Sequence, residues 1–182
     1  MSKKTMLTLY NSLILSHMTY GIVAWGDTDL ALMKRLFILQ KRALRIINKA
    51  KYNSHTGPLF KSMNLLNIYD IYQLECSKIY AKFCLNILPD YLHEQTAPEP
   101  VPNTFSTRNN LHVLPPLTKS KQEEQLIKFK VAKAWNALPP KIKEYKQNPK
   151  SLKSFCKMVK KHKIDSYLTC CQVTNCYVCQ NL

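Results

Sequence analysis

The chain has 182 residues, of which 46% are hydrophobic, so it is long enough for one domain or two small ones and apolar enough to fill a core. This composition excludes a wholly disordered chain, and no run approaches the roughly 18 consecutive apolar residues that a membrane-spanning helix requires. Lysine and arginine number 27 against 11 acids, which gives a formal net charge of +16. Only three glycines are present, which argues against an enzyme built on a glycine-rich phosphate loop.

The positive charge is densest in the C-terminal third. Residues 119–182 carry 14 lysines and 4 acids, whereas residues 1–118 carry 13 basic residues and 7 acids. Such an excess favours a polyanionic partner, because neutralising phosphates releases condensed counterions and gives affinity without sequence readout. The alternative is a lysine-rich solvated surface, since net charge by itself identifies neither a fold nor a function.

The sequence predicts an intracellular protein, in the nucleus or the cytoplasm. The start, Met1–Lys4, is basic like that of a signal peptide, but polar residues such as Thr8 and Asn11 break the apolar run behind it. No small-residue cleavage site follows. The seven cysteines are an odd number without a paired framework, which is typical of a reducing compartment.

Apolar side chains recur at spacings of three and four over residues 4–18, which predicts a first helix. Two glycines within residues 20–26 interrupt this pattern. Asp27 and Asp29 then offer capping oxygens and favourable negative charge for the next helix, which we predict over about 29–50.

Two further helices are predicted in the N-terminal half. Pro58 suits the first turn of a short helix through residue 63, because its missing N–H would be unpaired there anyway. Asn67 is the predicted cap of a helix over about 68–88, which Pro89 ends. Together these elements predict a helical bundle over residues 1–95.

The helix predicted at 29–50 has two chemically different faces. At about 100° per residue, six cations fall within an arc of about 120°: Lys34, Arg35, Lys41, Arg42, Arg45 and Lys49. The opposite face is apolar and is predicted to pack: Leu32, Met33, Leu36, Phe37, Leu39, Ala43, Leu44, Ile46 and Ile47. A solvated face of an amphipathic helix would give the same pattern, but Lys51 and the polar loop at 54–56 beside it favour phosphate contacts.

Pro98, Pro100 and Pro102 predict an extended linker. Beyond it, residues 111–114 and 126–131 have patterns of short strands. In the second of these segments apolar residues alternate with lysines, although Ser120 and Glu123 nearby have the spacing of a helix capping box. A helical turn with Trp135 and a last helix over about 152–168 follow.

The predicted fold is therefore mostly α, with four parts. These are a helical bundle at 1–95, a Pro-rich linker at 96–118, a small basic α-rich unit at 119–168 with the option of a two-stranded β-hairpin, and a Cys-rich tail at 169–182.

No catalytic constellation is apparent. Nucleotidyl transfer needs at least two carboxylates that share divalent metals, and helix capping explains the close pair Asp27 and Asp29. The five histidines are scattered and form no Ser-His-Asp, Cys-His or metal-binding spacing. We therefore predict that the chain alone is not an enzyme and uses no cofactor in catalysis.

The one candidate metal site is the cysteine cluster near the C-terminus: Cys170, Cys171, Cys176 and Cys179. Thiolates at these spacings are able to close a tetrahedral zinc site. A strong zinc pattern has two separated Cys-x-x-Cys pairs, whereas this segment has one pair crowded into ten residues. A tail of unliganded thiols is the alternative that the pattern favours.

Several segments resemble the region downstream of the polymerase palm in non-LTR (LINE-type, Jockey/CR1-like) retrotransposon reverse transcriptases. The first is LYNSLILSHMTYGIVAWG at 9–26, and the second is LQKRALRII at 39–47. Further matches follow in the family's order to about residue 168: 54–61, 70–72, Thr107-Arg108 and WNALP at 135–139.

The resemblance implies the thumb-like and C-terminal part of a reverse transcriptase, with the catalytic palm and its paired aspartates upstream of this chain. It implies a grip on the backbone of an RNA or DNA duplex, with contacts from Lys41, Arg42 and Arg45 and a weaker one from Arg108. A membrane partner is not expected. The alternative is a helical protein-interaction module or an inactive, decayed fragment.

Overall fold

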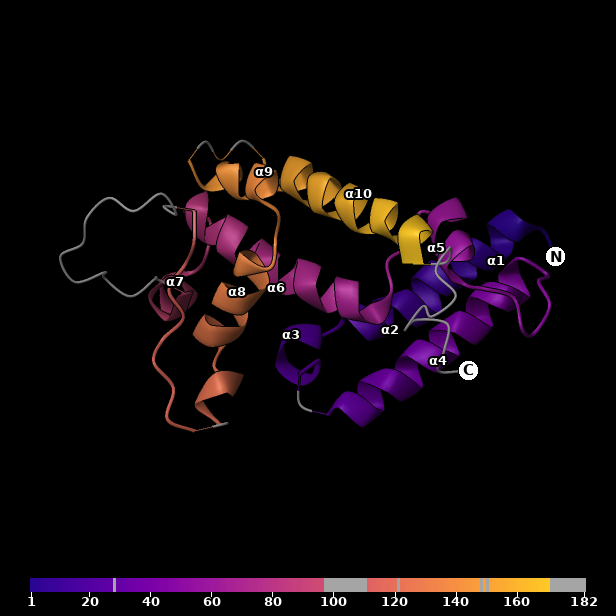
Figure 1. The fold of residues 1–182 in the computed structure, drawn as a ribbon, viewed down its shortest axis with the longest axis horizontal. Helices are drawn as coiled ribbons and strands as arrows, with labels where there is room; N and C mark the ends of the chain where they lie inside the picture. The colour runs from indigo at the N-terminus through magenta and orange to yellow at the C-terminus, as the bar shows by residue number, and fades with distance from the viewer. Residues whose placement is uncertain (28, 97–110, 121, 148, 150, 171–182) are drawn as a thin grey trace. The chain divides into compact units, whose positions relative to one another are not determined.

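The computed structural model describes residues 1–27, 29–96, 111–120, 122–147, 149 and 151–170 (Figure 1). Within these ranges the regular structure is helical and no strand is present, so the prediction of a mostly α protein is confirmed. Among the described residues, no helix combines the length and the apolar character that crossing a membrane requires.

The chain divides into two compact units. The first unit comprises Met1–Tyr72 and the described part of Lys160–Leu182, and the second comprises Gln73–Val159. This division differs from the predicted boundary in the linker at 96–118. The reason is that two helices, α6 (Ile68–Cys84) and α10 (Leu152–Cys170), each supply side chains to both units.

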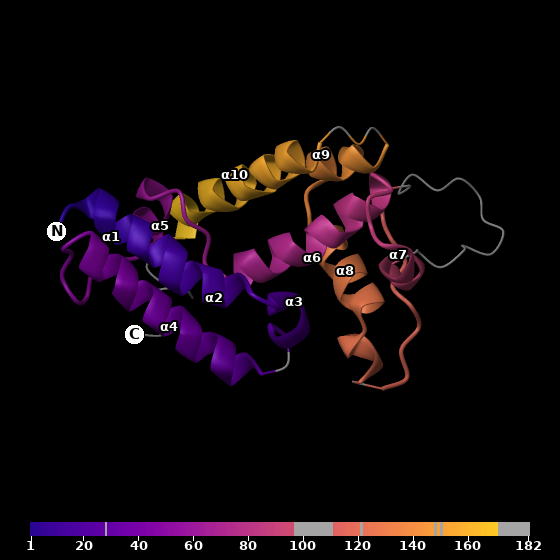
Figure 2. The same ribbon diagram turned by 180° about the vertical axis from the view of Figure 1, so that it is seen from behind.

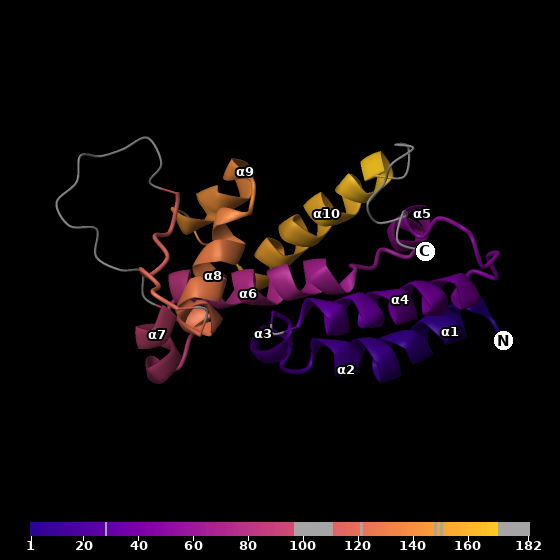
Figure 3. The same cartoon turned by 60° about the horizontal axis from the view of Figure 1, so that its bottom comes forward.

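The first unit begins with α1 (Lys3–Leu9), the π-helical segment η1 (Tyr10–Leu15) and α2 (Ser16–Thr19), which follow one another without a break. They lie side by side with α4 (Leu30–Ile47) (Figures 2 and 3). The N-terminal ends of α1 and α4 are both capped by polar side chains. Ser2 Oγ accepts from the Thr5 N–H at 3.1 Å, and Asp29 Oδ1 accepts from the Ala31 N–H at 2.7 Å.

The two glycines of 20–26 allow a tight passage between α2 and α4 through the short helix α3 (Ile22–Trp25). Gly21 has φ +60°, a conformation that costs other residues energy. Gly26 is required by space, because an added Cβ would lie 2.5 Å from the Ile22 carbonyl oxygen and 2.6 Å from the Tyr72 ring.

The core of the first unit forms on one face of α4, where spacings of four and three bring together Met33, Phe37, Gln40, Leu44 and Ile47. Gln40 is fully buried with every polar atom paired. Its Nε2 donates to the Tyr10 hydroxyl and to the Leu66 carbonyl, each at 2.9 Å, and its Oε1 accepts from the Ile68 N–H at 3.0 Å. One polar side chain therefore joins three segments of the core.

The next helices follow the predicted order. α5 (Gly57–Ser62) has Pro58 in its first turn, and Asn67 caps α6, because its Oδ1 accepts from the Asp70 N–H at 2.9 Å. α6 ends at Cys84, earlier than the predicted residue 88. Asn86 takes φ +54° there, so the helix ends before Pro89 is reached.

The second unit contains α7 (Asp90–Thr96), η2 (Glu123–Gln125), α8 (Ile127–Asn136), α9 (Pro140–Lys143) and η3 (Glu144–Lys146) besides its parts of α6 and α10. Trp135 is fully buried in its core, with ring centroids 4.5 Å from Tyr80 and 5.9 Å from Phe155. Trp135 is therefore a core residue of the second unit.

The predicted β-hairpin is wrong for both of its strands. Residues 127–136 are helical, because Val131, Ala134 and Trp135 bury one helical face at spacings of three and four. The backbone of Val113 pairs with a side chain instead of a strand. Its N–H donates to Asn136 Oδ1 at 3.0 Å, and its carbonyl accepts from Asn136 Nδ2 at 2.7 Å.

Candidate nucleic-acid interface

The exposed side of α4 is strongly cationic. Residues 30–69 contain eight lysines and arginines and no acid. Four of the six cations predicted to share a face are exposed: Lys34, Arg35, Arg42 and Lys49. Their side chains have no polar partner within the described ranges, so their charges are available to a ligand.

We call Arg35, Arg42 and Lys49 the cationic row. Arg35 and Arg42 are seven residues apart on α4, which places their Cα atoms about 10 Å apart along one side of the helix. Lys49 lies just beyond the end of α4 at Ile47 and has φ +50°. Lys34 lies about 100° further around the helix from Arg35. Lys51, just beyond the helix, is also exposed, with Ser54 half-buried and His55 exposed in the loop that follows.

The prediction that Lys41 lies on the exposed basic face is wrong. Its side chain is only 2% exposed, and its ammonium group lies 4.6 Å from the centroid of the Phe37 ring. The four-carbon stem is apolar and the ring face attracts the cation, so a lysine at the edge of the arc packs against the core.

Arg45 is also buried, at 5% exposure, although it lies in the middle of the predicted arc. The segment after α4 turns back over it, so that Nε donates to the Ser54 carbonyl at 3.0 Å and the guanidinium lies 5.9 Å from the Tyr52 ring centroid. Its Nη2 is buried and has no hydrogen-bond partner among the described residues. Lys41 and Arg45 therefore stabilise the unit and do not face a ligand in this structure.

Only part of the apolar face predicted for α4 is buried. Met33, Phe37, Leu44 and Ile47 are buried, but three residues of the predicted packing face are more than half exposed: Leu32, Leu39 and Ile46. The true core face is therefore narrower than the apolar arc of the sequence.

The remaining predicted site residues lie largely outside the described ranges. Arg108 does, and so do Cys171, Cys176 and Cys179, while Cys170 is the last residue of α10 and its side chain is not described. Within the described part of the chain, no three histidines, cysteines or acids gather as a metal site.

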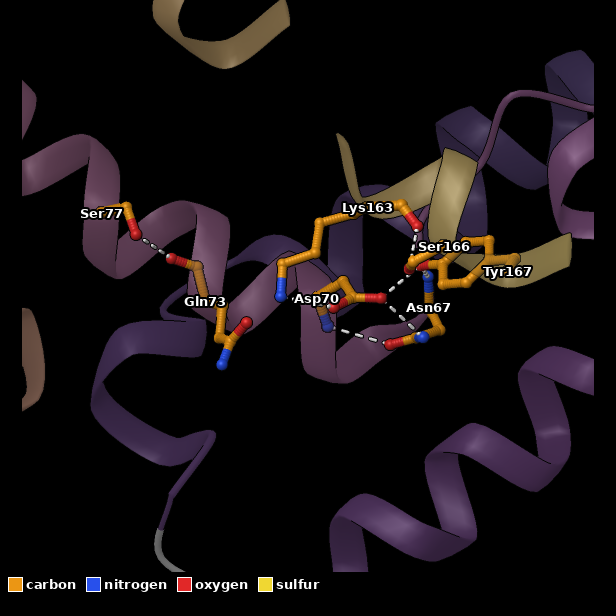
Figure 4. Close-up of polar contacts among 7 residues, drawn as sticks. All are labelled: Asn67, Asp70, Gln73, Ser77, Lys163, Ser166 and Tyr167. Atoms are coloured by element: carbon orange, nitrogen blue, oxygen red, sulfur yellow. Dashed lines mark hydrogen bonds and ion pairs between the residues drawn. The ribbon is translucent and has the colours of Figure 1, made fainter. Parts of the chain in front are cut away.

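A polar cluster that was not predicted joins the start of α6 to the end of α10 (Figure 4). Asp70 Oδ2 accepts from Asn67 Nδ2 at 2.7 Å and from the Tyr167 hydroxyl, and Asp70 Oδ1 lies 3.2 Å from Lys163 Nζ. The Asn67 N–H donates to the Tyr167 oxygen at 3.1 Å. Burial, and then the neighbouring Asp70 carboxylate, raise the pKa of Tyr167. Each polar group is paired, so the cluster fixes the fold and has no free group for chemistry.

Removing the Tyr167 hydroxyl should destabilise the first unit. Tyr167→Phe leaves the Asp70 carboxylate and the Asn67 N–H each short of a partner, so we expect the free energy of unfolding in urea to fall by about 1.5–3 kcal/mol. Tyr91→Phe, at a residue that is 72% exposed, is the control and should change it by less than about 0.5 kcal/mol.

The raised pKa of Tyr167 also predicts a pH dependence. The hydroxyl is favoured in the folded state, so its contribution is complete below the ordinary tyrosine pKa of 10.0 and is lost as the pH rises above that value. The drop in stability above pH 10 should be smaller in Tyr167→Phe, and an equal drop in both proteins would contradict this assignment.

Comparison with family models, with curated proteins and with solved structures found no match to this chain. The fold and the candidate site therefore define its class only as a mostly helical protein with an acid-free, cationic helix face in its first unit.

Proposed function

We propose that the chain binds the backbone phosphates of an RNA or DNA duplex through the exposed side of α4 and has no catalytic activity of its own. The observation that carries the proposal is the row Arg35, Arg42 and Lys49, with unpaired exposed cations and no acid anywhere in residues 30–69. The resemblance to the thumb region of non-LTR reverse transcriptases supports the same role.

The dimensions of the row suit a duplex. On α4, Arg35 and Arg42 are about 10 Å apart along the helix, which equals about three phosphate steps of one B-form strand. The helix holds Arg35 and Arg42 at a fixed separation, and arginine binds phosphate oxygens with two parallel hydrogen bonds. These contacts position a backbone and read no bases.

The structure changes which residues we assign to this role. The resemblance pointed to Lys41, Arg42 and Arg45, but two of these are buried, so we assign direct contacts to Arg35, Arg42 and Lys49, with Lys34 and Lys51 at the edges. Lys41 and Arg45 act as supports of the helix face.

The test compares two variants of equal net charge. Arg35→Gln/Arg42→Gln/Lys49→Gln removes the cationic row at α4 and its C-terminal end, and Lys153→Gln/Lys157→Gln/Lys161→Gln removes three exposed lysines of α10. We expect the first variant to raise the Kd for a duplex of about 20 base pairs at least about tenfold at 0.1 M salt, and the second to raise it less than about threefold.

Circular dichroism should show unchanged helicity in both variants. Equal weakening by the two triple variants would show that affinity follows net charge and not this surface. Unchanged affinity in both would favour the other class, a helical protein-interaction module or an inactive fragment. Incorporation of nucleotides on a primed template with Mg²⁺ would contradict the absence of catalysis.

A further inference from the structure

An unfilled apolar groove lies between the N-terminal helical segments and α4. It has a volume of about 220 Å³ and is lined on one side by α1 and η1 and on the other by α4. Its apolar lining includes Met6, Leu9, Leu13, Ile14, Ala43 and Ile46.

The side chains of this groove are exposed to an unusual degree for large apolar residues. Leu13 is 60% exposed, Ile46 is 66% exposed, and Leu9 and Ile14 are each 41% exposed. Leu39 is 56% exposed and shares a face of α4 with Ala43 and Ile46, because the three are spaced by four and three. Contiguous exposed apolar surface of this kind marks an interaction site, whereas single exposed residues do not.

The groove is elongated along the helices. A second hollow of about 450 Å³ shares Met6, Ile46 and Ile47 with the first and continues to Met1, Lys3 and Lys49. The first hollow is lined by α1, η1 and α4, and these helical segments lie side by side (Figure 3), so a rod such as a third helix suits it.

The charges around the groove are all positive. Lys3 and Lys4 are exposed on α1, Arg42 is exposed on α4, and Lys49 is exposed just beyond the end of α4. Neither residues 1–26 nor residues 30–69 contain an acid. A second copy of this chain would bring these cations against the same cations, which opposes self-association. The phosphates of a nucleic acid would complement these positive charges, but a nucleic-acid backbone has no apolar side chains to cover the groove.

We propose that this groove binds an acidic amphipathic helix of a protein partner. The apolar residues of such a helix, at spacings of three and four, would cover Leu13, Ala43 and Ile46, and its carboxylates would lie against Arg42 and Lys49. The groove lies beside the cationic row. The two sites share Arg42 and Lys49, but the apolar residues that line the groove do not belong to the row.

The test uses the full chain and a designed probe. The probe is a fluorescent peptide of about 18 residues with leucines at helical spacings of three and four and glutamates between them. The control peptide has the same composition in scrambled order, so it has the same charge. We expect anisotropy to give a Kd of about 1–10 µM for the probe and at least about tenfold weaker binding for the scrambled peptide.

Variants locate the binding. Leu13→Gln and Ile46→Gln should each weaken probe binding at least about tenfold and leave the Kd for duplex within about twofold. Leu117→Gln, at a leucine that is 99% exposed in the second unit, is the matched control and should change neither Kd more than about twofold. Failure of duplex binding would refute the proposed function and leave these results unaffected.

Three outcomes would overturn the inference. The first is equal binding of the probe and the scrambled peptide, and the second is probe binding that neither groove variant weakens. The third is a dimer of the chain, detected by sedimentation, that Leu13→Gln dissociates, because the groove would then hold a second copy.

Discussion

Replacing Trp135 by alanine is expected to lower the free energy of unfolding of the second unit by about 4 kcal/mol. The side chain is fully buried between the rings of Tyr80 and Phe155, and its Nε1 donates to the Leu111 carbonyl at 3.1 Å. Truncation therefore creates a large cavity and leaves a carbonyl without its donor.

Hydrogen exchange followed by mass spectrometry measures this effect in the unit where it occurs. Peptides from α8 should lose protection in Trp135→Ala, whereas Leu117→Ala, at a fully exposed side chain, should leave it unchanged. Trp135→Phe keeps a ring in the core and should cost less than the alanine change. Equal protection of these amides in Trp135→Ala and in the original chain would contradict the claim that Trp135 stabilises the core of the second unit.

The segment WNALP has a structural explanation that goes beyond Trp135. Asn136 pairs with the backbone of Val113 in both directions, and Leu138 is buried in the same core. The buried Lys143 donates to the Asn136 carbonyl at 2.7 Å, at the C-terminal end of α8, where a cation is favourable. Pro140 begins α9, where its missing N–H costs nothing. The WNALP segment is therefore explained by core packing and helix capping, and its residues need no ligand.

Gln40→Leu is expected to destabilise the first unit by about 3–5 kcal/mol. The change keeps the size of the side chain but removes all its polar atoms, so that the Tyr10 hydroxyl, the Leu66 carbonyl and the Ile68 N–H are buried without a partner. Each unsatisfied group costs about 1–3 kcal/mol. Burial already raises the pKa of Tyr10, and the loss of its donor Gln40 should raise it further.

Urea unfolding of the full chain, together with hydrogen exchange of the α4 amides, measures the destabilisation caused by Gln40→Leu. Gln147→Leu is the matched control because Gln147 is exposed, and it should change stability by less than about 0.5 kcal/mol. A Gln40→Leu protein as stable as the original would show that these three groups find other partners.

The position of α4 was predictable from the sequence, because a long apolar period and a capping aspartate identify such a helix locally. The burial of Lys41 and Arg45 was not predictable. It depends on the Phe37 ring and on the Ser54 carbonyl, and a helical wheel contains no information on a loop that turns back over the helix. An arc of cations predicts which side chains share a face, but the neighbours of the helix decide which of them meet solvent.

The other errors have physical causes of the same kind. Alternation over 126–131 fits a strand, but the same residues also supply the spacing of a helix, and the contacts of Trp135 decide between them. The cluster of Asp70 and Tyr167 joins residues 97 positions apart, so no local pattern reveals it. Asn67 was predicted as a cap, and only the structure shows that Asp70, whose N–H donates to Asn67, also bonds Lys163 and Tyr167 of the last helix.

The salt dependence of duplex binding tests the central claim most directly. Each phosphate contact contributes about 0.9 to the slope of log Kd against log salt on B-form DNA. Arg35→Gln/Arg42→Gln/Lys49→Gln should therefore lower the slope by about 2–3, and the triple lysine variant of α10 should lower it by less than about 1. An α4 variant with the slope of the original chain would contradict the claim that this row of cations contacts the phosphates.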